Sequence, residues 1–201
     1  MLQPTDTRRI SAPISTIDKP AAEAAFRSFL AAFGMTDNAE VLSNTPRRFV
    51  EAYAELFSPD EFHPTVFSNE ERYEELVLVR SIPFRSICEH HFLPFVGTAH
   101  VGYLVGEEVI GLSKLARAVD AHARRPQRQE RLTVEVAEWL ESALSPRGVG
   151  VIMTARHSCM TLRGARAAGS STVTSSFRGE LATDPHRSDF MSLLNLVDGN
   201  Q

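Results

Sequence analysis

Two short clusters in the sequence combine residue types that bind metal ions. They read Cys88-Glu89-His90-His91 and His157-Ser158-Cys159, and they hold both cysteines of the chain. Thiolates and imidazoles are the ligands that zinc prefers in proteins. Because Cys88 and His91 stand three positions apart, one turn can direct both at a single ion, and Cys159 can supply a third ligand from a distant segment. We therefore predict a zinc site formed by these three residues.

The sequence offers no evident fourth ligand. Three protein ligands and an open position are typical of catalytic zinc, because the open position holds the water that reacts. His90 and His157 each lie within two residues of a predicted ligand, where a group that transfers protons is useful. We predict that both histidines take part in catalysis.

Other interpretations of the clusters compete with a catalytic metal. A disulfide is disfavoured, because the residues after Met1 lack the apolar stretch of a secretory signal. A single cysteine or histidine is more often an ordinary buried or hydrogen-bonded residue than a ligand. The clustering of both cysteines with histidines favours a metal over these readings. A structural zinc stays open as an alternative, although such sites normally have four protein ligands.

Composition limits the class of protein. The chain has 201 residues, 43% hydrophobic and 23% charged, and a formal net charge of −4. This length allows one substantial core and a small helical appendage. No apolar run approaches the roughly 20 residues that span a bilayer, and the negative charge argues against nucleic acid as a partner. We expect a cytoplasmic globular protein.

The hydrophobic pattern divides the chain into three parts. Residues 1–19 are expected to form a loose arm, 20–72 a helical region, and 73–201 an α+β domain. In the helical region the spacing of apolar residues predicts one helix over 22–33 that stops at Gly34, and a second from Pro46 to Phe57. Residues 58–72 are expected to be a loop.

The domain after residue 73 alternates strand and helix patterns. We expect strands at 76–84, 95–105, 149–157 and 172–177, a helix capped by Ser113, another after Pro126, and a last one from Asp184. If the strand ending at His157 continued, His157 and Cys159 would share one side of it. This order of elements predicts an α+β fold with an antiparallel sheet.

Polar residues between the two clusters suggest binding sites for an anion and for a purine base. Ser113, Lys114 and Arg117 at a helix start combine amide donors with cations, as an anion site does, although a solvated helix face is the commoner explanation of any one arginine. Arg163 could add a charge for phosphate. In Gln129-Glu130, the carboxylate can accept two parallel hydrogen bonds from a guanine edge.

Several stretches together resemble the GTP cyclohydrolase I family. The matching segments are 86–91, 110–117, 125–133, 157–159, Arg163-Gly164, 170–175 and 177–179, and the likeness covers roughly residues 40–196 in unbroken order. The resemblance implies zinc as cofactor, bound by Cys88, His91 and Cys159. It implies that GTP is converted to 7,8-dihydroneopterin triphosphate and formate, the first step of folate or pterin biosynthesis.

The family also implies roles for the other residues. His90 would protonate the imidazole ring of the purine, His157 would assist later steps, and Ser113 would lie near the ribose hydroxyls. Glu130, with Gln129 beside it, would anchor guanine. The triphosphate would be held by Lys114, Arg117, Arg163 and Arg48. The sequence departs from the family at Glu51, where some members have a lysine, and a carboxylate there cannot bind phosphate.

The family fold is an antiparallel sheet with helices on one face, the tunnelling fold, which closes into a barrel when subunits assemble. The resemblance implies a homo-oligomer, usually a decamer with sites at subunit interfaces. Two alternatives stay open. One is a same-fold enzyme that uses another purine nucleotide or serves a deazapurine pathway. The other is a non-catalytic protein whose zinc only stabilises an oligomer.

Overall fold

The computed structural model describes residues 17–35, 39–61 and 63–195. Its contacts divide the chain into two compact units, one within Ala12–Pro59 and one that includes Asp60–Gln201. This boundary falls earlier than the predicted one at residue 72. The predicted N-terminal arm lies outside the described residues up to position 16. The two units are described separately.

The N-terminal unit is a pair of helices, α1 (Lys19–Ala32) and α2 (Ala39–Leu56). The Asp18 side chain caps α1, and the rings of Phe26 and Phe49 stack at 3.8 Å between the two helices. The prediction for α1 is confirmed. The predicted start of α2 is wrong, because Pro46 lies inside the helix. A proline there cannot donate to the carbonyl of Leu42, and Arg27 Nε donates to that oxygen instead, at 3.3 Å.

The second unit is built on a five-stranded sheet with the strand order β5-β2-β3-β6-β7. The strands are β2 (Leu76–Cys88), β3 (Pro94–Leu104), β5 (Pro126–Gln127), β6 (Gly148–His157) and β7 (Thr172–Gly179). Neighbouring strands are antiparallel except β5 and β2, which are parallel over two residue pairs. The predicted antiparallel sheet is confirmed.

A second, two-stranded sheet joins segments that were expected to be irregular. Strand β1 (Val66–Ser68) lies in the predicted loop, and β4 (Glu108–Ile110) lies between the strand expected at 95–105 and the helix expected from Ser113. Three residue pairs are too short a pattern to stand out in the sequence. Through this pairing, the residues before position 72 belong with the sheet unit.

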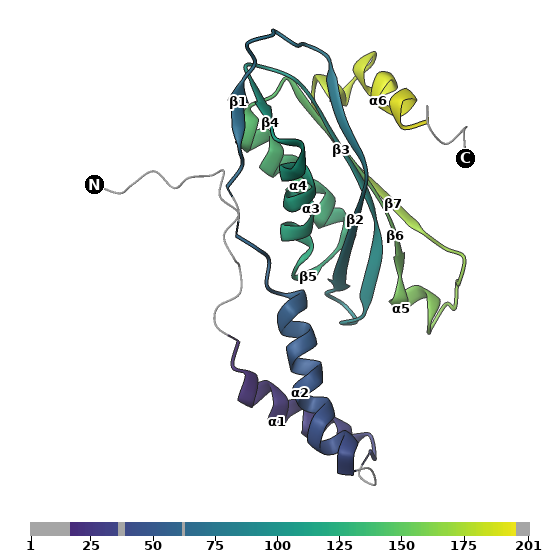
Figure 1. Ribbon diagram of the computed structural model, residues 1–201. Coiled ribbons are helices and arrows are strands. Elements are labelled where there is room, and N and C mark those ends of the chain that lie inside the picture. Colours follow the sequence, from purple (N-terminus) through teal and green to yellow (C-terminus); the bar gives the residue numbers. More distant parts are fainter. Residues whose placement is uncertain (1–16, 36–38, 62, 196–201) are drawn as a thin grey trace. The chain divides into compact units, whose positions relative to one another are not determined.

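Two helices cover one face of the large sheet, α3 (Leu112–Ala123) and α4 (Gln129–Leu144) (Figure 1). Alternate residues of β3 and β6, such as Val101 and Val151, are fully buried against them in the main core. The predicted α+β class is therefore confirmed, with α3 and α4 as the helices packed on one face. Among the described helices, none is long and apolar enough to cross a membrane.

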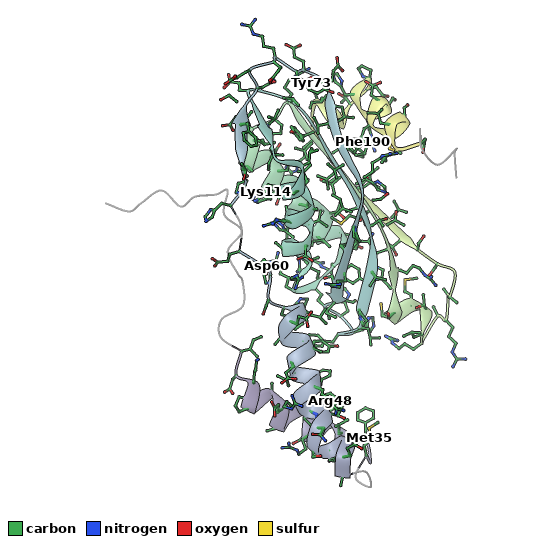
Figure 2. All side chains as sticks on the ribbon, in the orientation of Figure 1. Met35, Arg48, Asp60, Tyr73, Lys114 and Phe190 are labelled. Carbon is green, nitrogen blue, oxygen red and sulfur yellow. The ribbon has the colours of Figure 1, made fainter. Side chains whose placement is uncertain are left out.

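The last helix, α6 (His186–Asn195), lies on the opposite face of the sheet (Figure 1). Its Phe190, labelled in Figure 2, is fully buried in a smaller core with Leu104 and Ile152. A Cβ at Gly150 would lie 2.8 Å from the Phe190 ring, so only glycine leaves room for this contact. A short 3-10 helix, Glu180–Ala182, connects β7 toward α6.

Candidate metal centre and active site

Strand β3 explains how ligands from distant segments meet. It lies between β2 and β6, and its residue Phe95 pairs with Ser86 on one side and with His157 on the other. The end of β2 and the end of β6 are therefore neighbours at the start of β3. Cys88 is the last residue of β2, and Cys159 follows the end of β6 by two residues.

Two local structures direct the ligands toward one point. In the loop after β2, the Phe92 amide donates to the Cys88 carbonyl at 2.8 Å, and this turn brings His91 Nδ1 to 3.9 Å from Cys88 Sγ. After β6 the chain turns into α5 (Ser158–Thr161), which carries Cys159. The expectation that the strand continues to Cys159 is thus wrong, because the strand ends at His157. Ligand atoms of Cys88, His91 and Cys159 lie within 4.8 Å of one another.

The chemistry of these donors fits a divalent transition metal. Both cysteines are free thiols, which disagrees with a disulfide. Burial, and next the neighbouring Cys88, raise the pKa of the Cys159 thiol. A bound cation would reverse this effect by stabilising thiolates. Among the described His, Cys, Asp and Glu residues, no fourth ligand joins the group. The site is therefore suited to zinc with an open position.

His157 lies beside this group in a tightly packed environment. Its ring stacks on Phe95, with centroids 4.5 Å apart and planes at 8°, and its Nε2 is 2.8 Å from Oε1 of Gln129. Burial lowers the pKa of His157, and the negative charge of Glu130 partly opposes this shift. The stacking and the hydrogen bond hold the imidazole in place, near the Glu130 carboxylate.

His90 has a more open environment, with 63% of its side chain exposed. Its Nε2 lies 3.8 Å from Oε1 of Glu89. Glu89 in turn accepts from Arg128 Nε at 2.9 Å and from Arg131 at 2.6 Å, both from the start of α4. These ion pairs attach the loop that carries His90 to α4.

Further polar contacts among residues of β5 and α4 hold in place the arginine that pairs with this loop. Buried Gln127 accepts from Arg131 at 2.6 Å and donates to Glu135 at 2.7 Å, and Glu135 also pairs with Arg125. Sequence reasoning missed Glu89 and Glu135 as members of this network. The density of polar residues over 124–131 was the available signal, but it does not show which acidic residues they meet.

Two predicted substrate residues lie near the metal ligands. Glu130 is exposed in the first turn of α4, and the charge of Arg163 lowers the pKa of Cys159, opposing the effect of burial. Gln129 differs from them because it is only 1% exposed and its amide contacts protein groups. A guanine contact by the Gln129 side chain would need those bonds to break.

Ser113, Lys114 and Arg117 lie at the other end of α3 from the metal ligands. The carbonyl of Ala123, at the end of α3, accepts from Ser86 Oγ at 2.7 Å, so that end approaches the metal loop. Lys114, labelled in Figure 2, stands nine residues earlier, a rise of about 14 Å along the helix. The backbone of Lys114 is therefore separated along α3 from the end of the helix that approaches the metal loop. Ser113 also does not cap the helix, because Gly111 holds that position.

Arg48 belongs to the helical unit, on the exposed surface of α2 (Figure 2). Glu51, one turn later, accepts from Arg47 at 2.9 and 3.0 Å. The Glu51 carboxylate is thus paired with the neighbouring cation Arg47.

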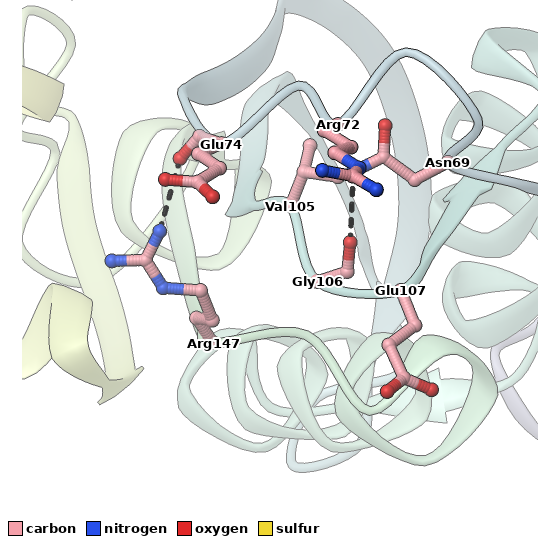
Figure 3. A pocket seen from close by; sticks show the side chains of 7 residues that line it. All are labelled: Asn69, Arg72, Glu74, Val105, Gly106, Glu107 and Arg147. Carbon is pink, nitrogen blue, oxygen red and sulfur yellow. Dashed lines mark hydrogen bonds between the residues drawn. The ribbon is translucent and has the colours of Figure 1, made fainter.

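A pocket of about 550 Å³ lies far from the predicted site, where β3 ends (Figure 3). Arg147 donates to the carbonyl of Glu74 at 3.1 Å, and Asn69 to that of Gly106 at 2.9 Å. Arg147 also pairs with Glu180 at 2.6 Å. None of the predicted site residues lines this pocket, so we assign the chemistry to the metal-ligand end of the sheet.

The fold and this site define a class: an α+β enzyme with a three-ligand metal site flanked by histidines. Comparison with known proteins narrows the class. Residues 22–195 match the sequence model of the family described as GTP cyclohydrolase I. The chain belongs to the GTP cyclohydrolase I family.

Individual relatives agree with this assignment. A GTP cyclohydrolase 1 of Geobacillus kaustophilus is 50% identical over 179 residues, which cover 86% of this chain and 94% of the relative. One of Bacillus subtilis is 49% identical over 174 residues, 84% of this chain and 90% of the relative. Among solved structures, an archaeosine synthase QueF-Like in the apo form aligns with 52% of this chain and 94% of its own, at 19% identity and a TM-score of 0.44.

Proposed function

We propose that this protein is a zinc-dependent GTP cyclohydrolase that converts GTP to 7,8-dihydroneopterin triphosphate and formate. The observation that carries the proposal is the convergence of Cys88, His91 and Cys159 within 4.8 Å, beside His157, in a chain of this family. Zinc held by these residues would supply a nucleophile from water at neutral pH. Pterin synthesis of this kind would place the enzyme in the cytoplasm.

The chain's own residues would bind the base and move protons. Glu130 is exposed and anionic, so its carboxylate can accept both hydrogens of the guanine edge. His90, exposed next to a ligand, would donate a proton to the purine imidazole ring as it opens. His157 would transfer protons in the later steps, in which Ser113 contacts the ribose hydroxyls.

The triphosphate would be held by Lys114, Arg117, Arg163 and Arg48. Because Lys114 lies about 14 Å along α3 from the end that approaches the metal loop, we propose that it reaches the metal ligands of a neighbouring subunit. The sheet supports assembly: within the described residues, β2 pairs with β5 over only two residue pairs, and β7 is an edge strand. Unpaired edges favour a closed homo-oligomer, and we expect a decamer.

The experiment is to incubate the purified protein with GTP, with and without a chelator. We expect formate and, after oxidation, pterin fluorescence, both lost with the chelator and restored by zinc. Formate without a pterin would indicate arrest after ring opening and would direct attention to His157 and Ser113. No product from a fully metallated oligomer would refute the proposal.

A further inference from the structure

Hydrogen bonds around Gln129 determine which way its side-chain amide points. Nε2 lies 3.1 Å from the Met153 carbonyl, 3.0 Å from the Thr172 carbonyl and 3.1 Å from Oγ1 of Thr174. Carbonyl oxygens only accept, so the nitrogen of the amide, and not its oxygen, must face them. Oε1 therefore points the other way, toward His157.

Two threonines order the rest of this network. Thr133 Oγ1 donates its one hydrogen to the Gln129 carbonyl at 2.8 Å, and it lies 2.7 Å from Thr174 Oγ1. Since Thr133 has no second hydrogen, Thr174 must donate to it, which leaves the lone pairs of Thr174 for the Gln129 amide. The network thus has one direction of donation throughout. It is shielded from water, because Gln129 and Thr133 are each 1% exposed.

His157 lies at the end of the network. Its Nε2 is 2.8 Å from Gln129 Oε1, an oxygen that can only accept, so Nε2 carries the hydrogen. In the neutral ring, Nδ1 is then the nitrogen with the lone pair. The stacked ring of Phe95, 4.5 Å away, restrains the imidazole against rotation. Both the orientation and the tautomer of His157 are therefore determined by its neighbours.

We propose that Gln129 is a positioning residue that holds His157 in its Nε2–H form and leaves Nδ1 to accept a proton during the reaction. This role rests on the proposed cyclohydrolase activity. It differs from the guanine contact that the sequence suggested for Gln129, and it leaves Glu130 as the residue that binds the base. A partner that orients a catalytic histidine contributes through geometry and tautomer and need not touch the substrate.

The first test reads the tautomer directly and does not depend on turnover. Solid-state ¹⁵N NMR of the histidine-labelled holoenzyme, with His157→Asn to assign the signal, should show a neutral His157 protonated on Nε2. Protonation on Nδ1 in the unsubstituted protein would overturn the proposal. If this protein failed to convert GTP but showed the Nε2–H form, the proposed function would fail, while the assignment of the His157 tautomer to its bond with Gln129 would stand.

The second test separates positioning from substrate binding. In Gln129→Leu we expect kcat to fall about tenfold to a hundredfold with KM unchanged. Because this change removes the amide that donates to the Met153 and Thr172 carbonyls and can prevent folding, Thr174→Val is the second variant, with Thr174→Ser as the matched control that keeps the hydroxyl. Thr174→Val should lower kcat by a smaller factor than Gln129→Leu does. Thr174→Ser should have the kcat of the unsubstituted protein. A rise in KM at unchanged kcat in either Gln129→Leu or Thr174→Val would show a substrate contact and refute the proposal.

Discussion

The metal-ligand end of the sheet and the beginning of α3 carry the two halves of the predicted site, and one chain completes only the first. At the sheet end, strand pairing brings Cys88 and Cys159 together, with His157 beside them. At the beginning of α3, Lys114 lies about 14 Å along the helix from the end that approaches the metal loop. We propose that the second half serves the metal ligands of another subunit.

The largest effect is expected from removing a metal ligand. Cys159→Ala should lose bound zinc, and kcat/KM should fall at least about a thousandfold, since metal catalysis contributes several kcal/mol. Elemental analysis measures the bound zinc, and the rate of formate release gives kcat/KM. Ser158→Ala, one residue earlier in α5, is the matched control. Normal zinc content in Cys159→Ala would remove this residue from the ligand set.

Removing His90 should separate chemistry from metal binding. We expect His90→Ala to keep its zinc and its assembly while kcat falls about 10²- to 10⁴-fold, the usual contribution of a general acid or base. Elemental analysis measures the zinc content, size-exclusion chromatography the assembly, and the formate assay kcat. Loss of zinc in this variant would place His90 among the ligands instead.

Lys114→Ala tests whether the two halves come from different subunits. Loss of a charged hydrogen bond to phosphate should lower kcat/KM about tenfold to a hundredfold. Co-expression of Lys114→Ala with Cys159→Ala should recover activity, because some mixed sites receive both intact halves. Co-expression of Cys159→Ala with His90→Ala is the control, since those two residues belong to the same half. Recovery no greater than in this control would place Lys114 in the site of its own chain.

The smallest effect is expected near the pocket of Figure 3, away from both halves. Hydrogen bonding to Arg147 lowers the pKa of Glu180 from its usual 4.5. The ion pair therefore adds stability at pH above 4.5, and this contribution is lost as the pH falls through the lowered pKa. Glu180→Gln should unfold at a slightly lower temperature at pH 7, with the difference shrinking in acid and with GTP turnover unchanged. An altered kcat would mean that this end of the sheet also acts in catalysis.

Much of the sheet end was predictable because its signals are local. The spacing of Cys88 and His91 reflects one turn, and the alternation over 149–157 reflects one strand, so both could be read from neighbouring residues. The α+β class followed from the order of such segments. By contrast, β1 and β4 pair over only three residues each, and the local sequence of neither strand indicates which segment it pairs with.

The features that sequence missed depend on long-range placement. Gln129 looks like a surface residue at a helix start, and only the position of β6 and β7 shows that its amide is buried against Met153 and Thr172. The start of α2 was placed too late because Pro46 is usually a first-turn residue, and the bond from Arg27 that compensates for it comes from another helix. The contribution of Arg48 to phosphate binding stays a prediction, as does the loss of such a contact at Glu51.

The position of β3 between β2 and β6 has a consequence for the stability of the folded chain. An ion held by Cys88 and Cys159 would act as a cross-link between the end of β2 and the turn after β6, which are distant in sequence. Since such an ion binds the folded sheet and not the unfolded chain, each tenfold rise in free zinc above its dissociation constant adds about 1.4 kcal/mol of stability. The temperature of unfolding should therefore rise with the concentration of free zinc, and zinc-depleted protein should unfold at a lower temperature than the zinc-bound form.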